Sequence, residues 1–440
     1  MAKVITTELQ HSGASGANIT LDSSKNVTIG NNLSVTGTIP ADKLTGTAAA
    51  INGSNITNLP AANLTGALPA ISGASLTNLP ASGVNPNILH NPAFQVWQRG
   101  ETLTGLEVDD YLADRWKQWG GAGGQTGRST IERSTDVPAD LNVEASMKIS
   151  CTTAETPGAS EGYMVIQRLE GKDVAHLKCG TSDAESVTVS FWVKGDASKT
   201  YSFNLFRSTG TGTNRVFTKT FPVTTSWVKQ TITVAGDTSQ AYDEIGGNGH
   251  QMQVGIALMQ GTQSATNNAW QDYSSGKYSV SGSDNFFEST DRRLYLAGMK
   301  LEIGTSATDF HQPDYSSELR RCERYLEYVV EGNAQPICTA AGFAGDMLTG
   351  AIQFRTPKRT ATPSMVKVTG TDYLRFRYTY YNNGANNTQD GDDFNLQYKS
   401  YYGAGLWFTS FDFGDNNRMG AGGLLYSNNT AARLAFSSEL

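Results

Sequence analysis

The sequence predicts an all-β protein, and three observations support this fold class. Glycine reaches 46 residues, apolar residues make up 38% of the chain and charged residues only 17%, a composition that suits short strands joined by many turns. Apolar and polar side chains alternate along several segments, which is the period of a strand with one buried face. No segment shows the regular alternation of strands and helices that a parallel sheet requires.

Residues 1–37 contain two short apolar runs around a turn-forming sequence. Ile19 and Leu21 precede Asp22-Ser23-Ser24, and Val27 and Ile29 follow it, which predicts a hairpin. The first residues include no apolar run of the kind that a secretory leader contains. We expect this segment to attach the chain to a larger assembly.

Residues 38–84 carry an internal repeat. Related sequences begin at Pro40, Pro60 and Pro80, so the unit recurs every 20 residues. The units share a few aliphatic side chains: Leu44, Ile51, Ile56 and Leu59, then Leu64, Ile71, Leu76 and Leu79. One such chain buries too little apolar surface to offset roughly 1–2 kcal/mol per residue of backbone ordering. Three parallel copies could bury these side chains around one axis, which predicts a homotrimeric stalk. The alternative is a flexible linker.

Residues 85–312 have the composition of a folded core. Six tryptophans fall in this range: Trp97, Trp116, Trp119, Trp192, Trp227 and Trp270. Period-two alternation recurs in 187–193, 201–205, 228–234, 254–258 and 295–303, and in the last of these we expect Tyr295, Ala297, Met299, Leu301 and Ile303 to share one face. Such strands, separated by Gly, Asn and Ser clusters, predict a β-sandwich, most simply a jelly roll.

Residues 313–332 contain the one strong helix signal. Asp314 can cap a helix that runs from Ser316 to Val330, and the apolar residues Leu319, Cys322, Leu326 and Val329 follow coiled-coil spacing. Two interpretations fit this pattern equally well. The helix is either a short trimeric neck between two domains or an amphipathic helix packed against its own sandwich.

Residues 333–440 return to a β pattern and form a predicted terminal domain. Leu374, Phe376, Tyr378 and Tyr380 alternate on one face. Two further strands are expected from Asn395 to Tyr402 and from Leu406 to Phe413, and both are rich in aromatic residues.

Charge and motif content argue against several classes of function. The formal net charge of -7 opposes binding to nucleic acid or to anionic membrane surfaces, and no apolar stretch is long enough for a membrane span. The four cysteines are too far apart for a zinc knuckle or a dense disulfide framework, so we expect reduced thiols. The histidines show no metal-binding spacing. We therefore predict neither a cofactor nor a metal site.

Catalysis on glycans would require two carboxylates about 5–10 Å apart. The candidate groups are Asp109 with Asp110, Glu155 with Glu161, and Asp390 with Asp392 and Asp393. None of them lies in a recognisable catalytic sequence, and acidic residues in Gly-rich loops are usually solvated. We expect the protein not to be an enzyme.

Binding of a sugar requires aromatic faces surrounded by amide and carboxylate groups. The terminal domain and one polar segment of the sandwich offer such mixtures. The candidate receptor-binding residues are Trp270, Tyr273, Tyr380, Tyr381, Asn382, Tyr401, Tyr402 and Trp407. For any one of these aromatic rings the alternative is packing in a core, where most large rings lie. Trp270 in particular could anchor its loop on the sandwich.

Four sequence motifs resemble those of bacteriophage tail-fibre and virion-fibre proteins, over roughly residues 85–330. They are Asn-Ile-Leu-His-Asn-Pro-Ala-Phe-Gln-Val-Trp-Gln-Arg-Gly from Asn87, Ala-Asp-Arg-Trp from Ala113, Met-Lys-Leu-Glu-Ile-Gly-Thr from Met299 leading to Phe310, and Arg-Arg-Cys-Glu-Arg-Tyr from Arg320.

This resemblance implies a homotrimeric fibre whose middle module is similar to the jelly roll of carbohydrate-binding modules. It implies a place in the virion and binding of a host surface glycan or protein without insertion into a membrane. The lack of a leader-like run at the start leads us to expect assembly in the host cytoplasm. Residues 1–37 match no known fibre attachment domain, and we expect them to contact either tail or capsid proteins. The expected function is non-catalytic attachment to the host cell. The alternatives are a capsid-attached decorating fibre and a tailspike that depolymerises glycans.

Overall fold

The computed structural model of the chain describes a set of ranges rather than every residue. They are residues 8–9, 19–21, 27–29, 86–121, 128–209, 212–240, 246–262, 264–274, 277–344, 346–379, 386–411 and 420–440. Contacts divide the chain into two units, Met1–Asn78 and Leu79–Leu440. The predicted stalk of residues 38–84 lies outside the described residues.

The first unit contains a small antiparallel sheet. Its strands are β1 (Glu8–Leu9), β2 (Ile19–Leu21) and β3 (Val27–Ile29), in the order β1-β2-β3. Ile19 pairs with Ile29 and Leu21 with Val27, so the predicted hairpin is confirmed.

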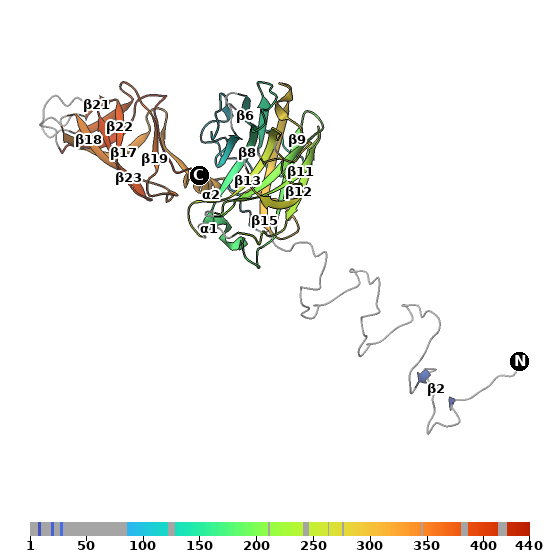
Figure 1. The fold of residues 1–440 in the computed structure, drawn as a ribbon. Helices are drawn as coiled ribbons and strands as arrows, with labels where there is room; N and C mark the ends of the chain where they lie inside the picture. Colours follow the sequence, from blue (N-terminus) through green and yellow to red (C-terminus); the bar gives the residue numbers. More distant parts are fainter. Residues whose placement is uncertain are drawn as a thin grey trace. The chain divides into compact units, whose positions relative to one another are not determined.

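The second unit begins with two antiparallel sheets of six strands each (Figure 1). The first sheet has the order β14-β11-β10-β13-β8-β5, with β5 Trp116–Gly121, β8 Gly162–Glu170, β10 Lys199–Arg207, β11 Arg215–Val223, β13 His250–Gln260 and β14 Ala269–Asp272. The second has the order β12-β9-β15-β7-β6-β4, with β4 Thr102–Leu103, β6 Ser129–Ser134, β7 Ser146–Cys151, β9 Val187–Gly195, β12 Val228–Val234 and β15 Arg293–Ile303. The chain crosses repeatedly between the two sheets, and side chains from both sheets pack in one core, so the predicted β-sandwich is confirmed.

Helical turns in the sandwich are short. They are α1 (Gly171–Val174), η5 (Ala175–Leu177) and η6 (Phe286–Glu288). The core lies between the two sheets, where Val189 and Phe191 of β9 and Phe203 of β10 are fully buried. Phe191 and Phe221, one from each sheet, meet edge to face with ring centroids 5.1 Å apart, a favourable aromatic geometry that joins the two layers.

The predicted alternation in β15 is only half correct. Met299 and Leu301 face the main core as expected, but at the start of the strand it is Leu294 and Leu296 that do so, and Ala297 lies in a separate cluster. The pairing of β15 with β9 is irregular between Ala297 and Lys300, where Gly298 has a positive φ of 56°. A bulge at this glycine adds one residue and shifts the side-chain phase.

The predicted helix is shorter in the structure. Helix α2 covers Tyr315–Glu323, and the Asp314 side chain accepts a hydrogen bond from Ser317 N at its start, so the predicted cap is confirmed. The prediction was wrong for the second half, because Leu326–Glu331 forms strand β16. Tyr328, Val329 and Val330 are residues that favour strands, and strand β25 (Arg433–Ser437) supplies the hydrogen-bonding partner.

Helix α2 packs against its own sandwich. Glu318 is fully buried, and its carboxylate accepts a hydrogen bond from Asn91 N at 2.6 Å and pairs with Arg321 at 3.0 Å. This is the second of the two interpretations that the sequence left open.

The remaining strands form a three-stranded and a seven-stranded antiparallel sheet. The orders are β16-β25-β19 and β21-β20-β24-β17-β18-β23-β22, with β17 Pro336–Ala344, β18 Met347–Gln353, β19 Ser364–Val368, β20 Leu374–Thr379, β21 Asn386–Gly391, β22 Asp393–Lys399, β23 Gly403–Thr409, β24 Gly422–Ser427 and β25 Arg433–Ser437. Leu374, Phe376 and Tyr378 share a buried face, as predicted, and Tyr380 lies outside the described residues. Tyr401 and Tyr402 lie in the turn between β22 and β23, not in a strand.

Candidate functional site

The first sheet of the sandwich has an apolar cluster on its outer face. Along β8, Tyr163 and Val165 point into the main core, whereas Met164 and Ile166 point away from it. With Ala257 of β13, these two side chains form a second cluster on the outside of the sheet. The outer face is therefore not a simple solvated surface.

The segment that follows β14 folds over part of this outer face. Its backbone is fixed by Asn204 Nδ2, which donates to Tyr278 O at 3.2 Å. Tyr278 packs edge to face against Trp119, with ring centroids 4.4 Å apart, and lies 5.5 Å from the ring of Tyr273. The hydroxyl groups of Tyr273 and Tyr278 are hydrogen-bonded to each other. Trp119, Tyr273 and Tyr278 thus form an aromatic wall above the sheet.

A hollow of about 260 Å³ lies beside this wall. It is lined by Trp119, Arg168, Phe206, Ser208, Asn214, His250, Gln253, Tyr273 and Tyr278, which we call the sheet groove. Strand register brings three of these residues together, because Arg168 of β8 pairs with Gln253 of β13, and Gln253 pairs with Phe206 of β10. The Phe206 ring stacks on His250 at 5.9 Å and 19° and meets Tyr273 edge to face at 5.1 Å.

Two buried polar atoms of the sheet groove make no hydrogen bond within the part of the chain that the structure describes. Arg168 Nε and His250 Nε2 are buried without a hydrogen-bond partner among the described residues. Burial, with Arg168 and Lys117 nearby, lowers the pKa of His250 to about 3, so the imidazole is neutral near pH 7. An unpaired buried polar atom costs about 1–3 kcal/mol, and a ligand that supplied the missing hydrogen bonds would recover part of this cost.

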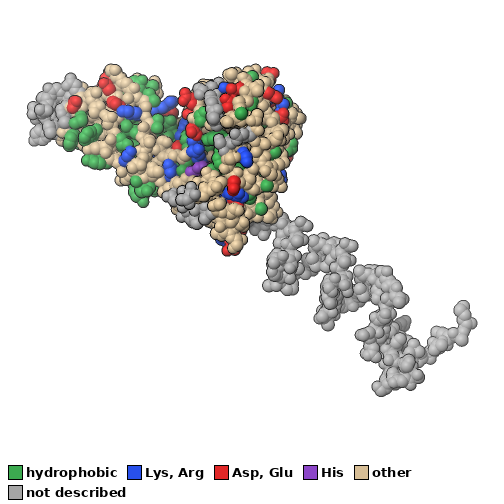
Figure 2. Space-filling model, viewed as in Figure 1, with side chains coloured by type: hydrophobic (Ala, Val, Ile, Leu, Met, Phe, Trp, Pro, Cys, Tyr) green, Lys and Arg blue, Asp and Glu red, His purple; other side chains and the backbone are tan. Residues whose placement is uncertain are grey.

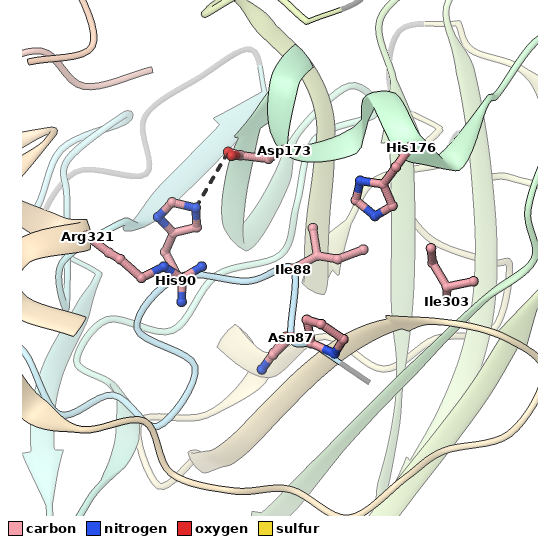
Figure 3. Close-up of a pocket in the computed structure, with 8 residues that line it drawn as sticks. Asn87, Ile88, His90, Asp173, His176, Ile303 and Arg321 are labelled. Atoms are coloured by element: carbon pink, nitrogen blue, oxygen red, sulfur yellow. Dashed lines mark ion pairs between the residues drawn. The ribbon is translucent and has the colours of Figure 1, made fainter. Parts of the chain in front are cut away.

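A second, larger hollow of about 480 Å³ lies beside the turn of α1 and η5, which follows strand β8 (Figure 3). Figure 3 shows His90 and Asp173 turned toward each other, with 3.5 Å between His90 Nε2 and Asp173 Oδ2. Burial lowers the pKa of His90. The lining residues are Pro86, Asn87, Ile88, His90, Asp173, His176, Ile303 and Arg321. They include no hydroxyl or thiol nucleophile, no aromatic ring besides the two imidazoles and only one carboxylate.

The structure separates the two sandwich residues that the sequence singled out. Tyr273 lines the sheet groove. Trp270 does not, because β14 is a strand that pairs with β11, where Trp270 lies opposite Phe217. Its indole packs on the main core and donates from Nε1 to Ala235 O at 2.8 Å. Trp270 is therefore the core anchor that the sequence offered as its alternative role.

The described candidates of the C-terminal strands, Tyr401, Tyr402 and Trp407, line neither of the two hollows found in these strands. Tyr380, Tyr381 and Asn382 lie outside the described residues. Tyr401 and Tyr402 are exposed, with their ring centroids 6.4 Å apart, and Tyr402 is 68% exposed. Trp407 stacks on the exposed ring of Phe343 at 6.3 Å and 21°. Figure 2 shows hydrophobic side chains of this kind on the surface of these strands.

Each carboxylate considered for catalysis forms an ion pair or accepts a backbone hydrogen bond within the chain. Four of them form ion pairs: Asp109 with Lys117 at 2.9 Å, Glu155 with Arg128, Asp390 with Arg375, and Asp393 with Lys367 at 2.6 Å. The other three accept a hydrogen bond from a backbone N–H: Asp110 from Glu107 at 2.7 Å, Glu161 from Gly158 at 2.7 Å, and Asp392 from Asp372 at 2.9 Å. Within the described ranges, no group of three or more His, Cys, Asp or Glu side chains could hold a metal ion, and no helix is long and apolar enough to cross a membrane.

Sequence reasoning missed most of the sheet groove. Trp119 and Tyr278 lie in segments of ordinary strand and loop composition, and Arg168, Phe206 and Gln253 come from three distant strands. The usable signal was the alternation itself: Phe206 follows Leu205 on the opposite face of β10. An aromatic residue on the outer face of a strand predicts a second packing surface or a binding surface.

Known proteins show similarity in structure only. No family profile matches the chain, and no curated protein is similar to it. A domain of tailspike protein 4 of bacteriophage CBA120 is 11% identical with a TM-score of 0.27, over 50% of this chain but only 21% of that one. A family 11 carbohydrate-binding module of Clostridium thermocellum is 12% identical with a TM-score of 0.25, over 48% and 96% of the two chains. The module TmCBM61, solved with β-1,4-galactotriose, is 12% identical with a TM-score of 0.24, over 50% and 99%. None of these similarities places the chain in a family.

Proposed function

We propose that this chain is a virion fibre protein of a bacteriophage and that it attaches the particle to a host-surface glycan without cleaving the glycan. The observation that carries the proposal is the sheet groove. It combines four aromatic side chains with the amides of Asn214 and Gln253, the Ser208 hydroxyl and the Arg168 guanidinium. Sugars present flat C–H faces edged by hydroxyl groups, and this mixture of side chains complements both.

The surroundings of the sheet groove favour binding rather than hydrolysis. Glycoside hydrolysis usually needs two carboxylates on either side of the scissile bond. None of the nine residues that line the sheet groove is acidic. The aromatic wall is held by packing and by the hydrogen bond between Tyr273 and Tyr278, so little side-chain freedom is lost when a ligand binds.

A glycan-binding measurement tests the site. Trp119→Ala removes one ring of the aromatic wall and is expected to weaken binding of host surface polysaccharide by roughly tenfold, since a stacking contact is worth about 1–2 kcal/mol. The matched control is Trp227→Ala, which removes a half-buried indole directly before β12, an edge strand of the other sheet. Equal binding by both variants and the unchanged protein, with no reducing ends released, would place the receptor site elsewhere on the chain.

The fibre part of the proposal is supported by the twenty-residue repeats and by the sequence motifs shared with phage fibres. Residues 1–37 are then the segment that contacts tail or capsid proteins, and residues 38–84 the stalk of a homotrimer. Three linked sites would raise apparent affinity by about 10²–10⁴ over a single site. Light scattering of the full chain at micromolar concentration is expected to give the mass of a trimer. A monomeric mass there would contradict the trimeric stalk, and labelling of purified virions would locate the protein on the tail or the capsid.

A further inference from the structure

The charge of the sheet groove differs from that of the chain as a whole. The chain carries a formal net charge of -7, yet Arg168 is the only charged residue among the nine that line the groove. The neighbouring cation is Lys117, which lies on the same face of the sheet opposite Ile166. Both cations lie close enough to His250 to lower its pKa. The side chains that line the groove therefore carry a net positive charge in a protein that is acidic as a whole.

The two cations differ in how far the chain already neutralises them. Lys117 forms an ion pair with Asp109 at 2.9 Å. Arg168 forms no ion pair with the side chain of any described residue. Its Nη1 donates to a main-chain oxygen of Leu440, the last residue of the sequence, at 3.3 Å, and its Nε has no hydrogen-bond partner among the described residues. A guanidinium can donate two parallel hydrogen bonds to one carboxylate, and Nε together with one Nη is one of the donor pairs that can do so. Arg168 retains this capacity.

We propose that the sheet groove binds a carboxylate-bearing sugar, such as a uronic acid residue of an anionic polysaccharide, with the carboxylate on Arg168. This inference rests on the proposed function, because it names the class of glycan that the same site takes. Phe206 on β10 and Trp119 on β5 belong to strands on opposite sides of β8 in the sheet, and both line the groove, where they offer faces for the sugar ring. The Gln253 amide, next to Arg168 in the sheet, is placed to bond a hydroxyl of the same sugar.

The neutral state of His250 fits an acidic ligand with free hydroxyl groups. Its imidazole adds no second positive charge near pH 7, so Arg168 alone selects the anion. A neutral imidazole can accept a hydrogen bond at one ring nitrogen, and a sugar hydroxyl can donate it.

The test uses the full chain and pairs of ligands that differ only in the carboxyl group. Polygalacturonate, alginate and hyaluronate are each compared with their carboxyl-reduced forms, in which the sugar ring and its linkages are kept. For at least one pair, the acidic form is expected to bind about tenfold more tightly at low salt, since a hydrogen bond to a charged group is worth a factor of this size. Arg168→Gln is expected to abolish the preference while retaining binding of the reduced form. Arg320→Gln, at an exposed position on α2, is the control and should keep the preference.

The outcomes separate this inference from the proposed function. Binding of reduced and acidic forms with equal affinity would overturn the carboxylate assignment and leave a neutral-glycan site. Arg168-dependent binding of dextran sulfate with the same affinity would show a general anion site and would also overturn it. Binding of neither form of any pair would contradict both the inference and the proposed function. A preference for the acidic form that survives Arg168→Gln would place the anion site on another cation.

Discussion

Two residues of β8, Arg168 and Glu170, show the difference between a polar site that the chain uses itself and one that it leaves open. Both point to the outer face of the sheet, and they are separated by one residue. Glu170 is fully buried and accepts from Arg324 Nε at 2.8 Å, from Arg324 Nη2 at 2.9 Å and from Tyr325 Oη, with Lys172 at 3.1 Å. Among the residues that the structure describes, Arg168 has one backbone acceptor, at Leu440, and no partner for its Nε.

The different hydrogen bonding of Glu170 and Arg168 indicates different roles for the two residues. Burial alone would raise the pKa of Glu170, but the hydrogen bonds from Arg324 and Tyr325 outweigh it and hold that pKa below its usual value. Both carboxylate oxygens of Glu170 accept hydrogen bonds from Arg324 and Tyr325, and these bonds join the end of β8 to the segment between α2 and β16. The Nε–H group of Arg168, by contrast, has no partner among the described residues and is the group that we assign to a ligand. Glu170 should therefore govern stability, and Arg168 should govern binding.

The largest effect is expected for Glu170→Gln. The change removes a buried negative charge and leaves Arg324 without its partner, so unfolding free energy should fall by about 3–5 kcal/mol. Urea unfolding, followed by tryptophan fluorescence, measures this loss. Glycan affinity of the folded fraction should stay unchanged, because Glu170 does not line the sheet groove.

The matched control for this variant is Glu331→Gln. Glu331 pairs with Arg433 at 3.3 Å, and both side chains are half-exposed, so the expected loss is within about 1 kcal/mol. If Glu170→Gln unfolds like the unchanged protein and binds glycan poorly, the assignment of the two β8 residues is reversed.

The sequence predicted the sandwich because one physical signal, the alternation of side chains, is local. Val189 and Phe191 face the core wherever β9 lies in its sheet. The same signal failed in β15, where the bulge at Gly298 changes the phase. It failed again after Glu323, because the choice between helix and strand there depends on pairing with β25, more than one hundred residues away in the chain.

The candidate site was harder to predict for the same reason. Arg168, Gln253 and Phe206 become neighbours only through the register of three strands, and no local pattern encodes that register. Trp270 shows the opposite error. Its polar neighbours in the sequence suggested an exposed loop, whereas its pairing opposite Phe217 turns the indole onto the core.

A smaller effect is expected from pH. The pKa of His250 is about 3 in the folded protein and about 6.5 when unfolded. Between these values the unfolded state binds more protons, so stability is full above pH 6.5 and falls as the pH drops through this window. Since the side chain is partly exposed, we expect a loss of about 1 kcal/mol between pH 7 and pH 5. Urea unfolding at both pH values should show that His250→Gln removes this part of the loss.

His311→Gln, at an exposed position, is the control and should leave the pH profile unchanged. Glycan affinity is also informative, because an imidazole that stays neutral keeps its acceptor. Wild-type affinity for a neutral glycan should therefore hold constant from pH 7 to pH 5. A sharp change in that affinity near pH 6 would show that His250 titrates normally and that the sheet groove is more open to water.

The smallest effect is expected for Tyr402→Ala in the turn between β22 and β23. Tyr402 is 68% exposed, and neither it nor Tyr401 lines any of the described hollows. A sugar that stacked on this ring would still be exposed to water on its other side, so the contact would add little to affinity. We expect glycan affinity to change less than twofold and unfolding free energy by about 0.5 kcal/mol or less, with Tyr315→Ala on α2 as the control for loss of an exposed tyrosine. A tenfold loss specific to Tyr402→Ala would move the receptor site from the sheet groove to the C-terminal strands, because it would show that an exposed ring, and not the preorganised aromatic wall, supplies the stacking surface.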